Sequence, residues 1–219
     1  MNTPVNKRPY DGAARQAHSA ATRQRIIDSG RALIVKHGYR ATTIAAIASD
    51  AGVSTASVYE LVGRKSVLLK ELVEQALSGR DHPIAGAERD YVSDMRAQSD
   101  ARTKLAIYAR AVGAIQARLA PLFLALRDAS TTEPEAARIW KEISDRRATN
   151  MRRLVADLAT TGQLRAGLSH HDAADIIWAM NSSELYVLFI EERHWTPAHY
   201  ERWLTDSWCR LLLDEGFVV

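Results

Sequence analysis

The chain has 219 residues, of which 47% are hydrophobic and 25% charged, and its formal net charge is +3. Such a chain can bury a sizeable core in one large domain or two small ones, which excludes a disordered chain and a small stapled scaffold. The single cysteine, Cys209, excludes an intrachain disulfide and a cysteine zinc site, and it is consistent with a reducing compartment.

The charge is distributed unevenly along the chain. Residues 1–80 carry 12 Lys and Arg against 6 Asp and Glu, whereas residues 81–219 carry 17 against 20. A basic first part joined to a mildly acidic second part indicates that only the first part meets a polyanion, although a chance fluctuation in solvated charge would look the same. No apolar run is long enough for a transmembrane helix, and the N-terminal stretch has no apolar segment of a secretory signal, so we expect a cytoplasmic protein.

The predicted elements begin after a loose arm over residues 1–14, which lacks apolar periodicity. From about Thr22, apolar side chains recur at helical spacing until Gly38, which supplies a C-terminal stop. Thr42 and Thr43 offer N-caps for a short second helix.

The second helix ends at Gly52, and Ser54 can cap a third helix, which stops at Gly63. A fourth helix carries Leu68, Leu69 and Leu72. Glycine, proline and several charges in residues 79–99 predict a domain junction. The expected parts are an arm over 1–14, a first domain with its linking fourth helix over 15–78, and a second domain over 79–219.

The second part again predicts helices only. One helix spans 101–119, and Pro121 breaks it before a short apolar helix through Leu126. Pro134 opens a long helix that ends near Gly162.

Ser169 and Asp172 resemble a capping box before a helix over 171–192, which is apolar nearly all round and should be buried on more than one side. Thr196 and Pro197 start the last helix, which carries a seam of Trp and Leu side chains. No convincing strand alternation appears, so we expect an all-α fold.

Residues 43–62 carry the most informative pattern. Two short helices are joined by a tight turn over 51–54, where Gly52 permits a positive φ, and the small Ala48 and Ala51 let the helices cross closely. The pattern is typical of a helix-turn-helix, whose second helix lies in the major groove of DNA. A generic helical hairpin in an all-α core is the alternative interpretation.

The residues around this unit strengthen the DNA-binding interpretation. In order, they are Arg23-Gln24-Arg25-Ile26-Ile27, His37-Gly38, Thr42-Thr43, Ile47-Ala48, Ala51-Gly52-Val53-Ser54, Val58-Tyr59, Lys65 and Leu68-Leu69. Residues 20–75 thereby closely resemble the N-terminal domain of TetR-type transcriptional regulators, and the stretch from Trp178 to Leu213 looks like a subset of the same family. The resemblance implies an all-helical fold with three DNA-binding helices, a linking fourth helix, and a larger helical domain that binds a small molecule and dimerises.

The resemblance also implies DNA contacts for individual residues. The positions that match phosphate contacts are Thr43, Tyr59 and Lys65, and those that match base-edge contacts are Thr55, Ala56 and Ser57. Each has a simpler interpretation, because Tyr59 could bury its ring in the core, Lys65 could be a solvated charge, and Thr43 could be a cap only.

The third helix departs from the family in its charge. Residues 54–62 contain no Lys or Arg, so this helix cannot form the bidentate Arg–guanine contact. Glu60 stands where family members often have a positive or aromatic residue, and Val62 stands where they often have an aromatic one. Glu60 could accept from cytosine N4 or repel phosphate, and shape readout would then carry more of the specificity. Backbone or minor-groove contacts could be added by Arg64, Lys7 and Arg8.

The second domain is expected to hold a ligand pocket. The residues on helices that border the pocket in TetR-like proteins are Tyr108, Val112, Phe123, Trp140, Arg147, Met151, Trp178 and Asn181. Aromatic side chains at this spacing are more often part of a core. Asn181 is the most informative of the set, because an amide on an apolar helix must find a partner in ligand, protein or water.

The last two helices resemble the dimer interface of the family, a four-helix bundle made from two chains. The interface candidates are Trp203, Leu204, Trp208 and Leu211. Burial of the same side chains within one chain is the alternative.

Other chemistries have little support in the sequence. His171 and Asp175 share a helix face beside His170, but two ligands in register do not make a metal site. No serine-hydrolase elbow, P-loop or zinc-protease motif occurs, so we expect neither an enzyme nor a cofactor or metal site. Cys209 lies in an apolar seam and is expected to be a small buried hydrophobe.

The leading hypothesis is a homodimeric, sequence-specific transcriptional regulator, a repressor as is common in the family, whose partners are operator DNA and an unidentified small molecule. Its two recognition helices would enter successive major grooves about 34–36 Å apart. The alternatives are a ligand-independent DNA-binding protein with a well-filled core, and a helical enzyme or adaptor without DNA binding.

Overall fold

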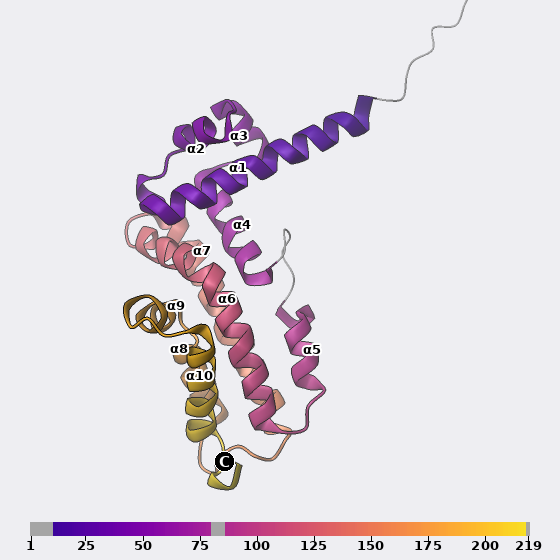
Figure 1. Ribbon diagram of the computed structural model, residues 1–219, viewed down its shortest axis with the longest axis vertical. Coiled ribbons are helices and arrows are strands. Elements are labelled where there is room, and N and C mark those ends of the chain that lie inside the picture. Colours follow the sequence, from indigo (N-terminus) through magenta and orange to yellow (C-terminus); the bar gives the residue numbers. More distant parts are fainter. Residues whose placement is uncertain (1–10, 80–85, 218–219) are drawn as a thin grey trace, which may run out of the picture. The chain divides into compact units, whose positions relative to one another are not determined.

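The computed structural model describes residues 11–79 and 86–217, and within these ranges the chain is all-helical with no strand (Figure 1). The expected all-α fold is therefore confirmed for the described part. The chain divides after Leu69 into two compact units, which we call the N-terminal unit and the regulatory unit.

The N-terminal unit is built from three helices and the start of a fourth. Their bounds are α1 Asp11–Ala41, α2 Ile44–Ala51, α3 Thr55–Leu61 and α4 Lys65–Ser78. The residues at the centre of its core are fully or almost fully buried, namely Ile26, Ile27, Ile34, Ile47, Val58, Leu68 and Leu69. Gly38 interrupts α1 with a φ of 79°, so the predicted stop lies where the sequence placed it.

The start of α1 corrects the prediction of a loose arm over residues 1–14. Residues 1–10 lie outside the described part, but the helix begins at Asp11, well before Thr22. The added turns are rich in alanine, which favours helix by intrinsic propensity, and most of their side chains are exposed. An exposed helical segment needs no apolar stripe, so periodicity alone could not find it.

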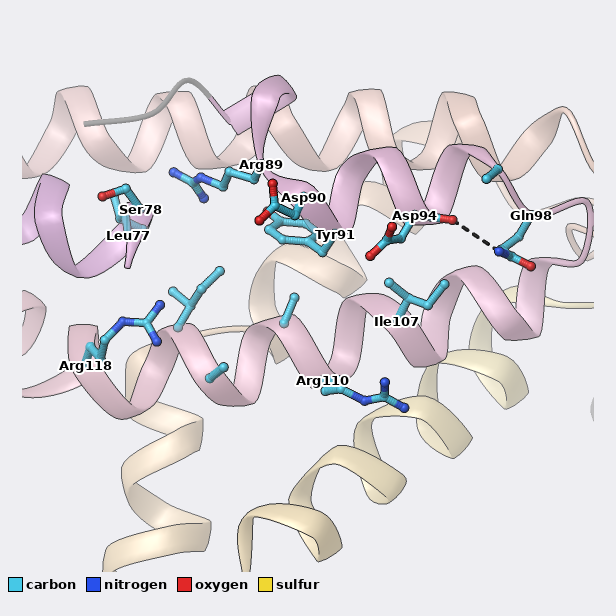
Figure 2. Close-up of a pocket in the computed structure, with 14 residues that line it drawn as sticks. Leu77, Ser78, Arg89, Asp90, Tyr91, Asp94, Gln98, Ile107, Arg110 and Arg118 are labelled. Carbon is cyan, nitrogen blue, oxygen red and sulfur yellow. Dashed lines mark hydrogen bonds between the residues drawn. The ribbon is translucent and has the colours of Figure 1, made fainter. Parts of the chain in front are cut away.

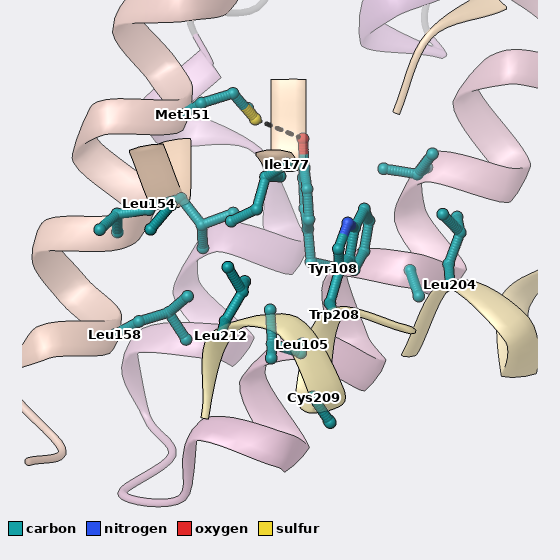
Figure 3. Close-up of a cluster of buried hydrophobic side chains, with 14 of the residues drawn as sticks. Leu105, Tyr108, Met151, Leu154, Leu158, Ile177, Leu204, Trp208, Cys209 and Leu212 are labelled. Atoms are coloured by element: carbon teal, nitrogen blue, oxygen red, sulfur yellow. Dashed lines mark hydrogen bonds between the residues drawn. The ribbon is translucent and has the colours of Figure 1, made fainter. Parts of the chain in front are cut away.

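The regulatory unit is a bundle around the long helix α6. Its elements are the 3-10 turn Gly86–Glu88, α5 Asp90–Arg96, α6 Ala101–Ser130, α7 Pro134–Ala159, α8 His170–Met180, α9 Ser183–Val187, the π turn Leu188–Glu192, α10 Pro197–Leu212 and the 3-10 turn Glu215–Phe217. Helix α6 packs against α5, α7, α9 and α10. In its core, Tyr108 stacks on Trp208 with ring centroids 5.4 Å apart, within a buried cluster that also contains Leu105 and Leu158 (Figure 3).

Pro121 does not break α6, contrary to the prediction of two helices over 101–126. The proline removes one hydrogen bond and crowds the carbonyl of Ala117, which costs about 3 kcal/mol in an isolated helix. Burial of Leu119, Leu122 and Leu126 on both sides of it offsets that cost. By length and composition α6 could also span a membrane, and no other described helix could, but half of its most apolar stretch is buried inside the unit, as in the core helix of a globular bundle.

The expected continuous helix over 171–192 is broken at Asn181. Helix α8 ends there, and Ser182 caps α9 by accepting a hydrogen bond from the Leu185 amide at 3.3 Å. The capping box itself is present, because Ser169 Oγ accepts from the Asp172 amide at 3.0 Å and donates to its carboxylate at 2.7 Å.

Helix α4 contributes to both units, so the compact units divide nine residues before the predicted boundary at 78/79. Its later residues belong to the regulatory unit through contacts with α6 and α7. Lys70 pairs with Glu142 at 2.8 Å, and Glu74 pairs with Arg146 at 2.7 Å. The glycine-rich junction that the sequence suggested therefore follows α4 without marking the change of unit.

Candidate functional site

The first short helix of the N-terminal unit begins at a well-formed cap. Thr43 is exposed, and its Oγ1 accepts a hydrogen bond from the Ala46 amide at 3.1 Å. Thr42 is buried instead and donates to the Gly38 carbonyl at 2.8 Å. Thr43 therefore marks an exposed helix N-terminus, where the helix dipole favours a phosphate.

The turn between α2 and α3 depends on Gly52. Its φ of 66° and ψ of 39° are left-handed, and the next amide, of Val53, donates to the Ala48 carbonyl at 2.9 Å. This arrangement satisfies the carbonyls at the end of α2 and reverses the chain in few residues. Ser54 then caps α3 by accepting from the Ser57 amide at 3.1 Å.

Helix α3 has one buried face and one exposed face. Val58 is fully buried, whereas Thr55, Ala56 and Glu60 are exposed. Tyr59 is 56% exposed, so its ring is not part of the core. The exposed face of α3 is therefore formed by small side chains, one tyrosine and one carboxylate.

Ser57 and Val62 have structural roles on this helix. The hydroxyls of Ser57 and Ser54 lie 2.9 Å apart and share a hydrogen bond, so Ser57 is only half available to a ligand. Val62 is buried at the end of α3, and the family aromatic that the sequence lacks there is replaced by a smaller apolar contact.

Two cations near α3, Lys65 and Arg23, donate hydrogen bonds to backbone carbonyls of neighbouring helices. Lys65 Nζ donates to the Tyr39 carbonyl at 3.0 Å, so the interpretation of Lys65 as a simple solvated charge is wrong. Arg23 Nε donates to the Leu61 carbonyl at 3.1 Å and caps the end of α3, a role that the sequence analysis missed. Arg64 is exposed.

The regulatory unit contains a buried polar cluster in its core. Asn181 Nδ2 donates to the Tyr108 hydroxyl at 2.7 Å and to Met151 Sδ at 3.1 Å, and the Tyr108 hydroxyl donates to Met151 Sδ at 3.2 Å. Gln116 Nε2 donates to the Asn181 carbonyl at 2.6 Å, and its Oε1 accepts from the Ser183 hydroxyl at 2.8 Å. Burial raises the pKa of Tyr108 well above its usual range, so it stays protonated.

Six of the eight predicted ligand residues line one cavity of about 80 Å³, which we call the effector cavity. They are Tyr108, Val112, Phe123, Arg147, Met151 and Asn181, and the remaining lining residues are Leu77, Arg89, Tyr91, Ile115, Gln116, Leu119, Ile143, Arg146 and Asn150. The predicted positions on α6, α7 and at the end of α8 therefore do converge on one cavity.

The two predicted tryptophans do not line this cavity. Trp140 and Trp178 line a separate outer groove of about 530 Å³ together with Lys141 and Asp145. The guanidinium of Arg147 lies over the Trp178 ring at 4.3 Å and donates to the Trp178 carbonyl at 3.1 Å. Arg147 therefore lines the effector cavity, whereas the indole of Trp178 does not.

A wider cleft adjoins the effector cavity, and the sequence analysis missed it. Its volume is about 630 Å³, and it lies between the end of α4, α5 and α6 (Figure 2). Arg89 and Arg118 lie on opposite walls near Ser78, as Figure 2 shows. Arg89 and Tyr91 line both the cleft and the effector cavity, so the two are contiguous. The sequence predicts only a junction for residues 79–99, and the signal in it for this wall is the apolar Tyr91-Val92-Met95 spacing of α5.

The N-terminal unit matches a known family. Residues 26–72 match the family model of bacterial regulatory proteins, tetR family. These residues form a TetR-type helix-turn-helix domain. The HTH-type transcriptional regulator YvkB of Bacillus subtilis, itself uncharacterised, is 38% identical over 74 residues, which are 34% of this chain and 39% of that relative. The match to this curated relative thus spans about two fifths of its length.

Solved structures extend the TetR-type likeness to the fold of nearly the whole chain. NalD, the secondary repressor of the MexAB-OprM multidrug efflux pump in Pseudomonas aeruginosa, has a TM-score of 0.69 at 20% identity and covers 91% of this chain and 99% of its own. The transcriptional regulator FadR of Bacillus subtilis, solved with stearoyl-CoA, has a TM-score of 0.68 at 18% identity and covers 84% and 96%. At sequence identities of 18–20%, the similarity to these two structures establishes a shared fold and nothing further. The matched family and these relatives are regulators, not enzymes.

The predicted interface residues of the TetR-type fold separate into two groups. Leu204 and Trp208 are fully buried in the core of the regulatory unit, so they are not accessible to a second chain, and the alternative of burial within one chain holds for them. Leu211 is 38% exposed, and Trp203 is half-buried. Leu188, which is not among the predicted interface residues, is 46% exposed on the π turn.

The remaining titratable candidates have local roles. His171 Nδ1 lies 3.4 Å from the Asp175 carboxylate, an i,i+4 pair on the exposed face of α8. Within the described ranges, no three His, Cys, Asp or Glu side chains are grouped to hold a metal ion. Cys209 is buried, as expected, and burial raises the pKa of its thiol.

Proposed function

We propose that this protein is a homodimeric, sequence-specific DNA-binding transcriptional regulator, acting as a repressor that a small molecule releases from its operator. The observation that carries the proposal is the exposed face of α3 on a fully capped helix-turn-helix. Tyr59 is 56% exposed on that face, while Val58 anchors the helix from below. A large aromatic side chain held at the surface of a basic unit is expected where it meets a partner.

The proposed DNA contacts divide into positioning and reading. Phosphates are bound by the α2 N-terminus at Thr43, by the Tyr59 hydroxyl, by Arg64, and by the Lys65 protons that Tyr39 does not use. The base edges are read by Thr55, Ala56, Ser57 and Glu60. Because α3 carries no Lys or Arg, thymine methyl contacts, cytosine contacts and DNA shape give the specificity.

The proposed effector site is the effector cavity with the adjoining cleft. The stearoyl-CoA complex of FadR supports ligand binding by this fold, and the polar cluster around Asn181 supplies the few directional groups that ligand sites contain. A ligand that prefers one arrangement of the helices would shift the population away from the DNA-competent state. A regulator that acts on the chromosome works in the cytoplasm.

The proposed homodimer uses the surface of the last helices. Among the described residues of the regulatory unit, Leu188 and Leu211 are the exposed large apolar side chains. The neighbouring segments contribute Phe189 and Trp203, whose ring centroids lie 4.5 Å apart. Two copies related by a twofold axis would cover these side chains and set the spacing of two recognition helices.

A ligand-independent regulator on the same fold is the second candidate. The observation that favours it is the volume of the effector cavity, about 80 Å³, because ligand pockets usually span about 300–1,000 Å³. The wider cleft of about 630 Å³ favours the ligand-responsive protein instead. Release of the DNA complex by any small molecule would decide against the second candidate.

The experiment that tests DNA binding is a fluorescence anisotropy titration over a salt series. The DNA upstream of the protein's own gene is compared with a scrambled fragment of equal length. The wild type should bind the upstream DNA more tightly, and Arg64→Met should weaken binding to both fragments and lower the slope of log Kd against log salt by about one, as loss of one phosphate contact does. Arg152→Met, an exposed arginine on α7, is the control and should change neither quantity.

Glu60→Gln tests the readout in the same assay. If Glu60 accepts from a cytosine, the variant loses selectivity between the fragments; if it only repels phosphate, the variant binds both more tightly. Equal, salt-independent affinity of the wild type for both fragments, or no binding at low salt, would contradict the proposed function.

A further inference from the structure

The effector cavity has an uneven charge. Three of its lining residues are arginines, Arg89, Arg146 and Arg147, and none is Asp or Glu. Arg146 is neutralised by Glu74 at 2.7 Å. Within the described part of the chain, Arg89 and Arg147 form no ion pair. The cavity therefore contains two guanidinium groups without a carboxylate in ion-pair contact, and the nearest compensation for Arg147 is the more distant Glu184.

The same arginines have unused hydrogen-bond donors. The Nε atoms of Arg147 and Arg89 are buried and have no hydrogen-bond partner among the described residues. The Tyr108 hydroxyl donates only to the thioether of Met151, a weak acceptor. Three donors at one cavity thus lack a strong acceptor. Among the described residues that line this cavity, Asn181 Oδ1 is a buried acceptor without a partner, and it suits a hydroxyl or N–H group on the same ligand.

The position of Arg147 makes this imbalance costly without a ligand. Burial lowers the pKa of its guanidinium, which nevertheless stays charged. Its contacts with the Trp178 ring and carbonyl compensate for only part of the lost hydration, since neither carries a negative charge, and the nearby Glu184 carboxylate is already paired with Arg127. A planar carboxylate or a phosphate fits the geometry of a guanidinium and supplies the missing charge.

We propose that the effector cavity binds an organic anion, whose carboxylate or phosphate group accepts hydrogen bonds from Arg147, Arg89 and Tyr108. The inference rests on the proposed function, because it names the ligand class of the proposed effector site. A cavity of about 80 Å³ admits the head group, and the apolar body extends along Leu77 and Ile115 into the cleft of about 630 Å³ that shares these residues. The same charges disfavour a cationic head group inside the effector cavity, whereas the adjoining cleft is also lined by Asp90 and Asp94.

The test is isothermal titration calorimetry on the full chain with four probes that share one tail and differ in head group. The probes are octanoate, octyl phosphate, octanol and octyltrimethylammonium. We expect at least one of the two anions to bind at least about tenfold more tightly than octanol, the factor expected for charge-assisted hydrogen bonds, and the cation to bind more weakly than octanol. The tighter of the two anions identifies the head group as carboxylate or phosphate.

Variants of the two arginines assign the binding to this cavity. Arg147→Met should weaken anion binding about tenfold or more and leave octanol binding unchanged, and Arg147→Lys should retain part of the anion affinity. Arg89→Met is the second variant, and it should also weaken anion binding. Thermal denaturation shows whether each variant folds, so Arg89→Met still tests the inference if Arg147→Met does not fold. Arg152→Met, on the same helix but outside the cavity, is the control.

The outcomes separate this inference from the proposed function. Equal affinities for octanoate, octyl phosphate and octanol, tighter binding of the cation, or unchanged anion binding by both arginine variants would overturn the inference. Release of DNA is measured separately by anisotropy. Anion binding that depends on Arg147 but does not release DNA supports the inference and contradicts the effector role in the proposed function.

Discussion

The ammonium of Lys65 lies 3.9 Å from the centroid of the Tyr39 ring and donates a 3.0 Å hydrogen bond to the carbonyl of the same residue. One side chain at the start of α4 therefore engages both the ring and the backbone of the end of α1. Because Tyr39 is buried, this contact joins two helices at the edge of the core of the N-terminal unit.

We expect Lys65→Met to lower the free energy of unfolding by about 1–2 kcal/mol, since it removes a cation–π contact and a charged hydrogen bond. Lys36→Met, an exposed lysine on α1, should change it by less than about 0.5 kcal/mol. Urea denaturation followed by far-ultraviolet circular dichroism measures both. Equal stability of the two variants would show that the Lys65–Tyr39 contact contributes nothing.

Gly52 provides a second test of the N-terminal unit. An added Cβ at Gly52 would meet no atom within 4 Å, so any cost of substitution comes from the φ of 66°. We expect Gly52→Val to destabilise the unit by about 1–2 kcal/mol and Gly52→Asn by clearly less, because asparagine tolerates the left-handed region. Thermal denaturation gives the order, and a Gly52→Asn variant as unstable as Gly52→Val would contradict it.

Two buried tyrosines of the regulatory unit should respond differently to loss of the hydroxyl. The Tyr108 hydroxyl bonds Asn181 and Met151, whereas the Tyr200 hydroxyl is buried without a partner among the described residues. Tyr108→Phe should destabilise the protein by about 1–2 kcal/mol, and Tyr200→Phe should be neutral or stabilising. The comparison uses chemical denaturation of the two variants, and equal losses would contradict the assigned hydrogen bonds.

The same tyrosines make stability depend on alkaline pH. Burial raises the pKa of Tyr108 and Tyr200, whereas a tyrosine in the unfolded chain ionises near 10. Above that pH the unfolded state loses protons that the folded state keeps, so the free energy of unfolding falls as the pH rises. The double variant Tyr108→Phe with Tyr200→Phe should show a smaller fall between about pH 9 and 11, measured by urea denaturation; an unchanged slope would contradict it.

The proposed dimer predicts an effect of charge on its surface. Leu188→Glu and Leu211→Glu should each shift the protein from dimer to monomer at micromolar concentration, because a carboxylate would be buried without a partner. Val35→Glu, at an equally exposed valine of α1, should leave the dimer intact. Sedimentation velocity distinguishes the species, and a wild type that is monomeric throughout would refute the proposed interface.

Much of the helix pattern could be predicted because local signals determined it. The caps at Thr43, Ser54 and Ser169 and the turn at Gly52 depend on hydrogen bonds and dihedral angles within a few residues. Pro121 was predicted wrongly because burial on both sides of α6 outweighed its local preference. Such tertiary compensation is not visible in a window of sequence.

The candidate site could be predicted only in part, for the same reason. Helical spacing brought six of eight ligand residues to one cavity, yet it did not show that Arg147 covers Trp178. The wall formed by Arg89 and Tyr91 was missed because a short helix after a glycine-rich junction has little periodicity. Burial of Leu204 and Trp208, in turn, depends on which face of α10 meets α6.

The division of the chain after Leu69 separates its natural fluorophores. All five tryptophans belong to the regulatory unit, the first being Trp140, and the N-terminal unit has only tyrosines such as Tyr39 and Tyr59. Excitation at the red edge of the tryptophan absorption band, where tyrosine does not absorb, therefore reports unfolding of the regulatory unit and gives no signal from the N-terminal unit. A variant such as Gly52→Val could lose its helix-turn-helix without any change in that signal, and a tryptophan introduced at Tyr59 would make the silent unit visible.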